Sequence, residues 1–114
     1  MVNNTQIALK YFEVSNQSNF DEIEKLLHEN ATYSSQNTGL YLWIQDILDM
    51  QKSFHGSFES LEWKIIDSHE EKPGIIKVDF EFIWVKSWEE LRFQGVEYII
   101  VANCKIQHIE IKNK

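Results

Sequence analysis

The feature that most constrains the fold is a run of alternating side chains past the middle of the chain. Lys77, Asp79 and Glu81 lie between the apolar residues of this run, which are Ile76, Val78, Phe80, Phe82 and Trp84. Successive side chains of a strand point to opposite faces of the sheet, so a period of two predicts a strand with one buried face. That face needs a second layer of structure to cover it.

Similar runs lie on both sides of this strand. Leu61, Trp63 and Ile65 alternate with polar residues, and Pro73-Gly74 separates them from the central run. A tight turn at this dipeptide makes the two strands antiparallel neighbours. Two more runs follow, each after a polar break: 91–101 after 86–90, and 106–111 after 103–104. The pattern predicts an antiparallel meander of four strands.

The first half of the chain predicts three amphipathic helices. In the first, apolar residues recur at helical spacing (Ile7, Ala8, Tyr11 and Phe12). Asn19 and Glu22 resemble a capping box that begins a second short helix, which we expect to end near His28. A third helix is expected over 42–54, before Gly56. Its inward side chains are expected to be Trp43, Ile44, Ile47, Leu48 and Phe54.

Size and composition fit an α+β protein of one domain, residues 1–114. The chain has 114 residues and is 43% hydrophobic, which is typical of globular proteins. No apolar run approaches the roughly 20 residues that a membrane-spanning helix needs, and no signal peptide is visible. Cys104 is the only cysteine, so an internal disulfide is excluded and a reducing compartment is favoured. We therefore expect a cytoplasmic protein.

The charge balance excludes several classes of partner. Eleven Lys and Arg face 18 Asp and Glu, for a net charge of −7, and the acidic residues are spread along the chain. This argues against nucleic acid and against anionic membrane surfaces. None of the four histidines has metal-ligand spacing, and no glycine-rich phosphate loop is present. We expect no metal and no cofactor.

Several short segments resemble the nuclear transport factor two-like superfamily, which includes SnoaL-like polyketide cyclases and ketosteroid isomerase. The resembling segments are Tyr11-Phe12, 20–23, 28–33, 93–98 and Lys105-Ile106. The resemblance implies three N-terminal helices packed on a strongly curved antiparallel sheet, as in a cone-shaped, cystatin-like α+β roll. It also implies an apolar cavity at the wide end of the cone and, often, a dimer through the outer face of the sheet.

The resemblance also implies candidate catalytic residues. The tyrosine and the protonated acid that polarise a carbonyl in the isomerase match Tyr11 and Glu97. The acid that shuttles the proton falls near Ser34-Ser35, where this chain has no carboxylate. A serine hydroxyl is too weak an acid to replace it without a base beside it. Isomerisation by that mechanism is therefore not expected.

Glu97 is the most informative of these positions. It is the only charged residue on its face of the run 91–101. If that face is interior, desolvation raises the pKa of Glu97 and makes it a candidate acid, base or hydrogen-bond donor. Alternatively, Glu97 is a buried group satisfied by Tyr11 or by a tryptophan N–H, or the register places it outside.

Aromatic residues provide candidates for a ligand site. We expect Tyr33, Trp43, Trp63, Phe80 and Trp84 to line a ligand cavity, with ordinary core packing as the alternative for each of the three tryptophans. Trp88 lies in a polar turn and is expected to be exposed.

Three functions remain open from the sequence. The first is the binding of a small, mostly apolar ligand. The second is an enzyme of cyclase, isomerase or dehydratase type that uses Glu97 with Tyr11. The third is a dimeric interaction module with a filled core. A homodimer is expected through apolar residues on the outer face of the sheet, namely Ile83, Val85, Tyr98 and Ile100.

Overall fold

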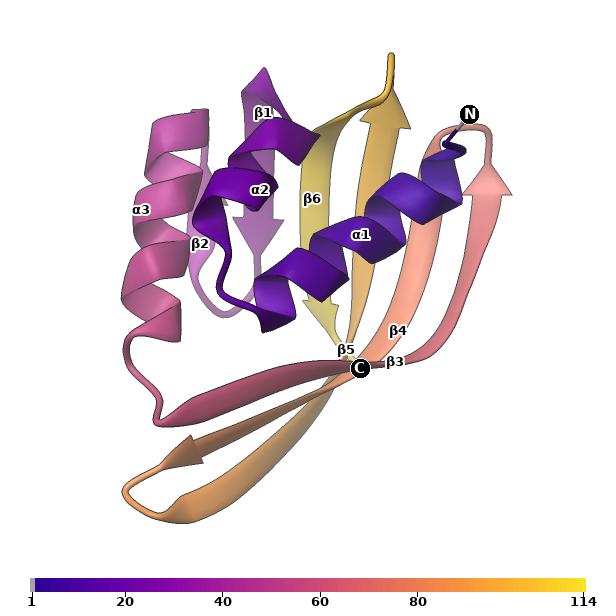
Figure 1. Cartoon of the computed structure of the whole chain (residues 1–114). Coiled ribbons are helices and arrows are strands. Elements are labelled where there is room, and N and C mark those ends of the chain that lie inside the picture. Colours follow the sequence, from indigo (N-terminus) through magenta and orange to yellow (C-terminus); the bar gives the residue numbers. More distant parts are fainter. Residues whose placement is uncertain (1) are drawn as a thin grey trace.

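A computed structural model of the chain describes residues 2–114 and contains three helices and six strands (Figure 1). The helices are α1 (Asn4–Asn16), α2 (Phe20–Leu26) and α3 (Ile44–His55). The strands are β1 (Leu27–Ser35), β2 (Gly39–Tyr41), β3 (Ser60–Lys72), β4 (Ile75–Lys86), β5 (Glu89–Ala102) and β6 (Lys105–Asn113).

The strands form one sheet in the order β2-β1-β6-β5-β4-β3. The predicted meander is present as β3 to β6, and each of its pairs is antiparallel. The turn at Pro73-Gly74 joins β3 to β4, with Gly74 at a φ of +83°, a conformation that glycine adopts without strain. The α+β class and the three helices on a curved sheet are confirmed.

The sheet is mixed rather than antiparallel throughout, because β1 pairs with β6 in parallel. Strands β1 and β2 were not predicted from the sequence. Helix α2 ends at Leu26 and β1 begins at the next residue, so no break separates them. The residues of β1 also lack the β-branched alternation of the later strands, and their register against β6 shifts between Leu27 and Thr32.

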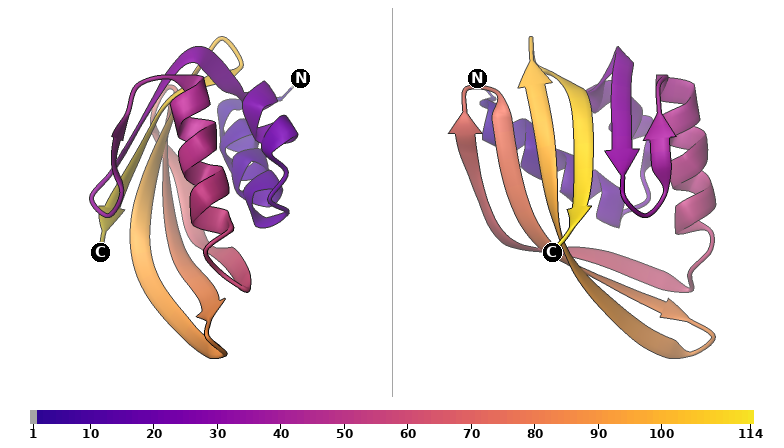
Figure 2. Two further views of the ribbon diagram at one scale, coloured as in Figure 1. Left: turned by 90° about the vertical axis from the view of Figure 1, so that its left-hand side faces the viewer. Right: turned by 180° about the vertical axis from the view of Figure 1, so that it is seen from behind.

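The sheet curves around the helix layer. Strands β3, β4 and β5 are long, and their far ends bend under the helices (Figures 1 and 2). Helix α1 crosses the concave face over β3 to β6, and α3 packs beside β1. Because the strands extend beyond the helices, the concave face is covered at one end and less covered at the other.

The core lies between α1 and the concave face. Side chains of α1 that the periodicity placed inward are buried, including Ala8 and Phe12. On β4, Ile76, Val78 and Phe80 are buried as the alternation predicts. The alternation of apolar and polar residues in β4 therefore predicted correctly which face of the sheet is covered.

One inward prediction on the third helix is wrong. Trp43 is 61% exposed. It is the N-cap of α3 and has an extended backbone, with φ −133° and ψ 150°. Its side chain therefore does not share the helical stripe that carries Ile47 and Leu48 into the core.

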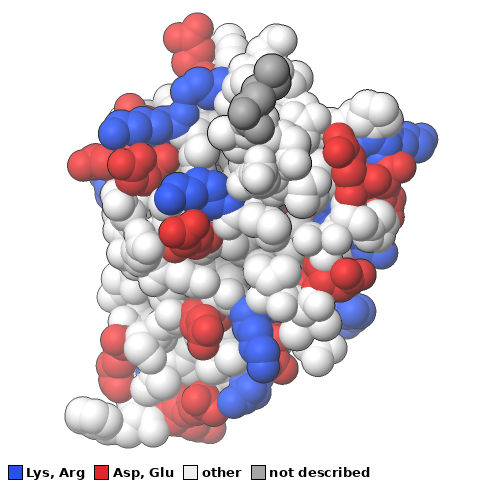
Figure 3. Space-filling model, turned by 45° about the vertical axis from the view of Figure 1, so that its right-hand side comes forward, with Lys and Arg blue, Asp and Glu red and all other residues white. Residues whose placement is uncertain are grey.

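Charged side chains are distributed over the surface. On the face shown in Figure 3, acidic and basic side chains are interspersed. Within residues 2–114, no helix is long and apolar enough to cross a membrane. Trp88 lies in the turn between β4 and β5 and is 92% exposed, as predicted.

Candidate ligand cavity

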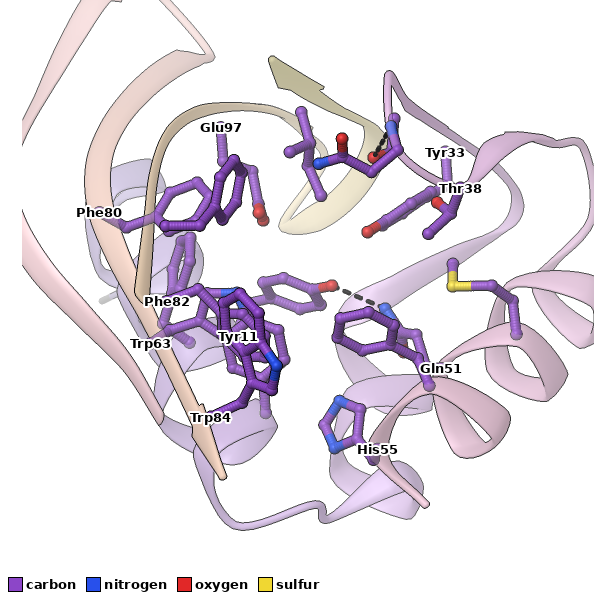
Figure 4. Close-up of a pocket in the computed structure, with 18 of the residues that line it drawn as sticks. Tyr11, Tyr33, Thr38, Gln51, His55, Trp63, Phe80, Phe82, Trp84 and Glu97 are labelled. Carbon is purple, nitrogen blue, oxygen red and sulfur yellow. Dashed lines mark hydrogen bonds between the residues drawn. The ribbon is translucent and has the colours of Figure 1, made fainter. Parts of the chain in front are cut away.

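A cavity of about 330 Å³ lies between the concave face of the sheet and the helices α1 and α3 (Figure 4). Ten of its lining residues are Phe, Tyr or Trp. Among the described residues that line it, none is Lys or Arg. The exposed residues Asn37 and Thr38, in the turn between β1 and β2, mark where the cavity meets solvent.

Strands β3 and β4 supply a continuous aromatic wall. Trp63 and Phe82 are cross-strand partners whose ring centroids are 4.6 Å apart. Phe82 stacks on Trp84 at 5.2 Å with 20° between the ring planes. Phe54 of α3 contacts the same cluster from the other side, 5.5 Å from Phe82. Rings that hold one another in this way give the cavity a preformed apolar surface.

Polar groups gather at the opposite end of the cavity. Glu97 of β5 is 2% exposed. Figure 4 shows its carboxyl group and the hydroxyl groups of Tyr11 and Tyr33 pointing into the same space. The Nε2 of Gln51, on α3, donates a hydrogen bond of 2.7 Å to the hydroxyl oxygen of Tyr11. Four elements thus bring polar side chains to one place.

Two buried oxygen atoms at this end have no hydrogen-bond partner among the described residues. They are Oε2 of Glu97 and Oε1 of Gln51. Buried polar atoms are normally paired, so an unpaired atom in a cavity lining calls for an explanation. The sequence left open that neighbouring side chains satisfy every polar atom of Glu97. In the structure they do not, because its Oε2 has no partner among the described residues.

Burial shifts the acidity of these groups. Desolvation raises the pKa of Glu97 to about 8, because the charged form is disfavoured away from water. Burial is the main cause that raises the pKa of Tyr11, and the nearby Glu97 raises it further. Burial also raises the pKa of Tyr33, with smaller contributions from Tyr11 and Glu97. At neutral pH Glu97 is therefore mostly the neutral acid.

His55 lies at the rim of the cavity. Its Nδ1 is 2.9 Å from the hydroxyl oxygen of Ser18, and its ring is 5.3 Å from that of Trp63. Burial lowers the pKa of His55 to about 4, so the imidazole is neutral at physiological pH.

The structure brings six of the seven predicted site residues together. The residues that line the cavity are Tyr11, Tyr33, Trp63, Phe80, Trp84 and Glu97. Trp43, predicted as a ligand contact, lies outside the lining for the reason given above. Within residues 2–114, no group of three His, Cys, Asp or Glu side chains is placed to hold a metal ion.

Sequence reasoning missed Gln51 and His55. Gln51 follows Ile47 by one helical turn on the inward stripe of α3, and His55 follows Gln51 by another. A polar residue on an otherwise apolar stripe is the signal that identifies such a position.

Comparison by sequence finds no relative: no protein-family model matches the chain, and no curated protein is similar to it. Comparison by structure does find similar proteins. The chain is similar to an NTF2-like protein of unknown function from Burkholderia pseudomallei, with a TM-score of 0.87 and 11% identity over 100% of this chain and 92% of the other.

Two further solved structures have the same architecture. A SnoaL-like protein from Shewanella putrefaciens gives a TM-score of 0.86 at 10% identity, over 99% of this chain and 80% of that one. A protein from Catenulispora acidiphila with a ketosteroid isomerase-like fold was solved in complex with trimethylamine. It gives a TM-score of 0.85 at 10% identity, over 96% of this chain and 85% of that one. The fold of this chain is therefore that of the nuclear transport factor two-like proteins, as the resemblance of its short segments implied.

Proposed function

We propose that the protein binds one small, mostly apolar molecule in the cavity, with a polar group of that molecule at Tyr11, Gln51 and Glu97. The observation that carries this proposal is an aromatic cavity of about 330 Å³ with unpartnered polar atoms at one end. Ligand sites in proteins have this character: mostly apolar walls, a few oriented polar groups, and volumes from about 300 Å³ upward.

The energetics favour an occupied cavity. An apolar space that nothing fills forfeits packing contacts and lowers stability. Transfer of apolar ligand surface out of water into this space is favourable, and the aromatic side chains supply large contact areas. A filled core, the third function considered above, would leave no space of this size.

The fold by itself does not decide the function, because one fold supports many unrelated activities. The neighbour from Catenulispora acidiphila was solved with trimethylamine, which supports a small molecule as the occupant here. The aromatic wall and Glu97 of this chain remain the main support.

Acid–base catalysis is a second candidate. A carboxyl group whose pKa is about 8 can donate and accept a proton at neutral pH. In this role Glu97 is the acid or base and Tyr11 orients the substrate. Once a substrate is known, Glu97→Gln should abolish turnover and retain binding; full turnover by this variant would exclude the role.

We further propose a homodimer formed through the outer face of the sheet. Ile83, Val85, Tyr98 and Ile100 lie on that face, are half-buried in one chain, and alternate with residues that face the cavity or core.

The interspersed charges and the net charge of −7 argue against nucleic acid as a partner. With one exposed cysteine and no internal disulfide, a cytoplasmic location remains our expectation.

Native mass spectrometry of gently purified protein tests binding and assembly together. We expect twice the chain mass plus a discrete additional mass that is lost on activation. A Thr38→Trp variant, which places an indole at the mouth, should be purified without the additional mass. Leu40→Trp, on the exposed strand β2 outside the lining, is the matched control and should retain it. Equal occupancy in both variants would locate the molecule outside the cavity, and a monomer would contradict the dimer.

A further inference from the structure

We propose that the molecule in the cavity is a hydrophobic ammonium ion, a protonated amine whose nitrogen lies beside the Glu97 carboxylate and whose apolar body lies against the aromatic side chains. This inference rests on the proposed function, the binding of a small molecule, and adds the chemical class of the ligand.

The two unpartnered atoms of the cavity are carboxyl and amide oxygens: the Gln51 oxygen is an acceptor in every state, and the Glu97 oxygen is one when the group is ionised. Oε2 of Glu97 and Oε1 of Gln51 lack partners among the described residues, and the amide nitrogen of Gln51 already donates to Tyr11. A partner of the Gln51 oxygen must therefore supply a donor, and a cationic donor also pairs with the ionised form of Glu97. A protonated amine carries donors and no acceptor, whereas a ketone or an ether carries only acceptors and leaves the Gln51 oxygen unpaired.

The walls suit a cation. The face of an aromatic ring carries negative electrostatic potential, and indole rings attract cations most strongly. Trp63 and Trp84 both line the cavity, together with the rings of Phe80 and Phe82. Phe80 is the strand partner of Gly95, two residues from Glu97, and lies on the Glu97 side of the cavity in Figure 4, so a nitrogen beside the carboxyl group lies near this ring. Trp63 and Trp84 face the rest of the ligand from the other end.

The surroundings do not oppose a positive ligand. No Lys or Arg occurs among the described residues of the lining, and His55 at the rim is neutral because burial lowers its pKa to about 4. Outside the mouth, a surface groove continues from Thr38 and Met50 and carries Asp46 and Asp49. A cation that enters by this route passes two carboxylates, which raise its local concentration.

Binding of a cation is coupled to ionisation of Glu97. The titratable groups that face Glu97 are Tyr11 from α1 and Tyr33 from β1, and its strand partners, Val78 on β4 and Ile111 on β6, are apolar. Since burial raises the pKa of Glu97 to about 8, an ammonium ligand must displace its proton at neutral pH. A neutral ligand expels none.

Benzylamine and benzyl alcohol provide a matched test, because they have the same shape and differ in charge below pH 9. Calorimetric titration should show benzylamine affinity rising roughly fifty-fold from pH 6 to pH 8, as the ionised fraction of Glu97 increases. Near pH 7, about one proton should be released per ligand bound. Benzyl alcohol affinity should stay constant over this range and be at least tenfold weaker at pH 8.

The Glu97→Gln variant should lose the preference for benzylamine and its pH dependence while still binding benzyl alcohol. Glu62→Gln, on the exposed side of β3, is the control and should behave as wild type. If Glu97→Gln does not fold, the wild-type pH profile decides alone. Equal or tighter binding of benzyl alcohol would overturn the ammonium ligand and leave the proposed function intact. Absence of binding by both compounds would count against both proposals.

Discussion

At the scale of single residues, the proposed ligand site depends on a carboxyl group in an apolar cavity. Glu97 was identifiable from the sequence because it is the one charge on its strand face. Its strand register, which the sequence left open, places it inside, with Ile111 of β6 opposite. Gln51, which supplies the second unpartnered oxygen, was not identified, although its place one helical turn after Ile47 on the inward stripe of α3 is the signal that marks it.

Glu97 makes the stability of the protein depend on pH. Its folded-state pKa of about 8 lies above its ordinary value of 4.5, so between these values the folded state binds a proton that the unfolded state has released. The stability that this proton binding gives to the folded state is fully present below about pH 4.5 and is lost as the pH rises through 8.

Urea unfolding of wild type and Glu97→Gln from pH 5 to pH 8 measures this effect. The free energy of unfolding of wild type should fall relative to the variant by on the order of 3 kcal/mol across the range. Parallel pH profiles for the two proteins would mean that Glu97 is solvated in the folded state.

At the scale of elements, the alternating strands were predictable and the first two strands were not. A period of two is strong in β4, where apolar and polar residues exchange at each step. In β1 the inward residues include the small side chains Ala31 and Ser35, which give a weak apolar signal. Pairing of β1 with β6 joins residues that are far apart in sequence, and no local pattern encodes that contact.

Gly95 leaves room for the Phe80 ring to lie over β5 beside the cavity. Its strand partner is Phe80, and a Cβ atom at Gly95 would lie 2.7 Å from the Cζ of Phe80 and 3.1 Å from the backbone oxygen of Lys112. Gly95→Ala should therefore displace the Phe80 ring and lower the free energy of unfolding by about 1–3 kcal/mol.

The matched control is Gln94→Ala, one residue away on the exposed face of β5, which should change stability by less than about 0.5 kcal/mol. Urea denaturation of both variants makes the comparison. Equal stability of Gly95→Ala and wild type would show that Phe80 has room to move without loss of packing.

At the scale of the whole molecule, a cavity exists because the curved sheet extends beyond the helices that cover it. The aromatic residues that the sequence suggested for a ligand site do line this space, apart from Trp43. Sequence patterns predict which face of a strand or helix a side chain lies on, but not how closely that side chain is packed against its neighbours. They therefore could not distinguish aromatic rings that fill a core from rings that border a cavity.

Methyl NMR tests whether a small molecule binds in this cavity. Met50 and Ile111 line the cavity, whereas Ile66 on β3 is 57% exposed and lies outside it. Titration with benzylamine at pH 8 should shift the Met50 and Ile111 methyl signals in a saturable way and leave Ile66 unchanged. Thr38→Trp should suppress these shifts, and Leu40→Trp should not. Saturable shifts at Ile66 alone, or unperturbed signals from Met50 and Ile111 with both benzylamine and benzyl alcohol, would contradict the account.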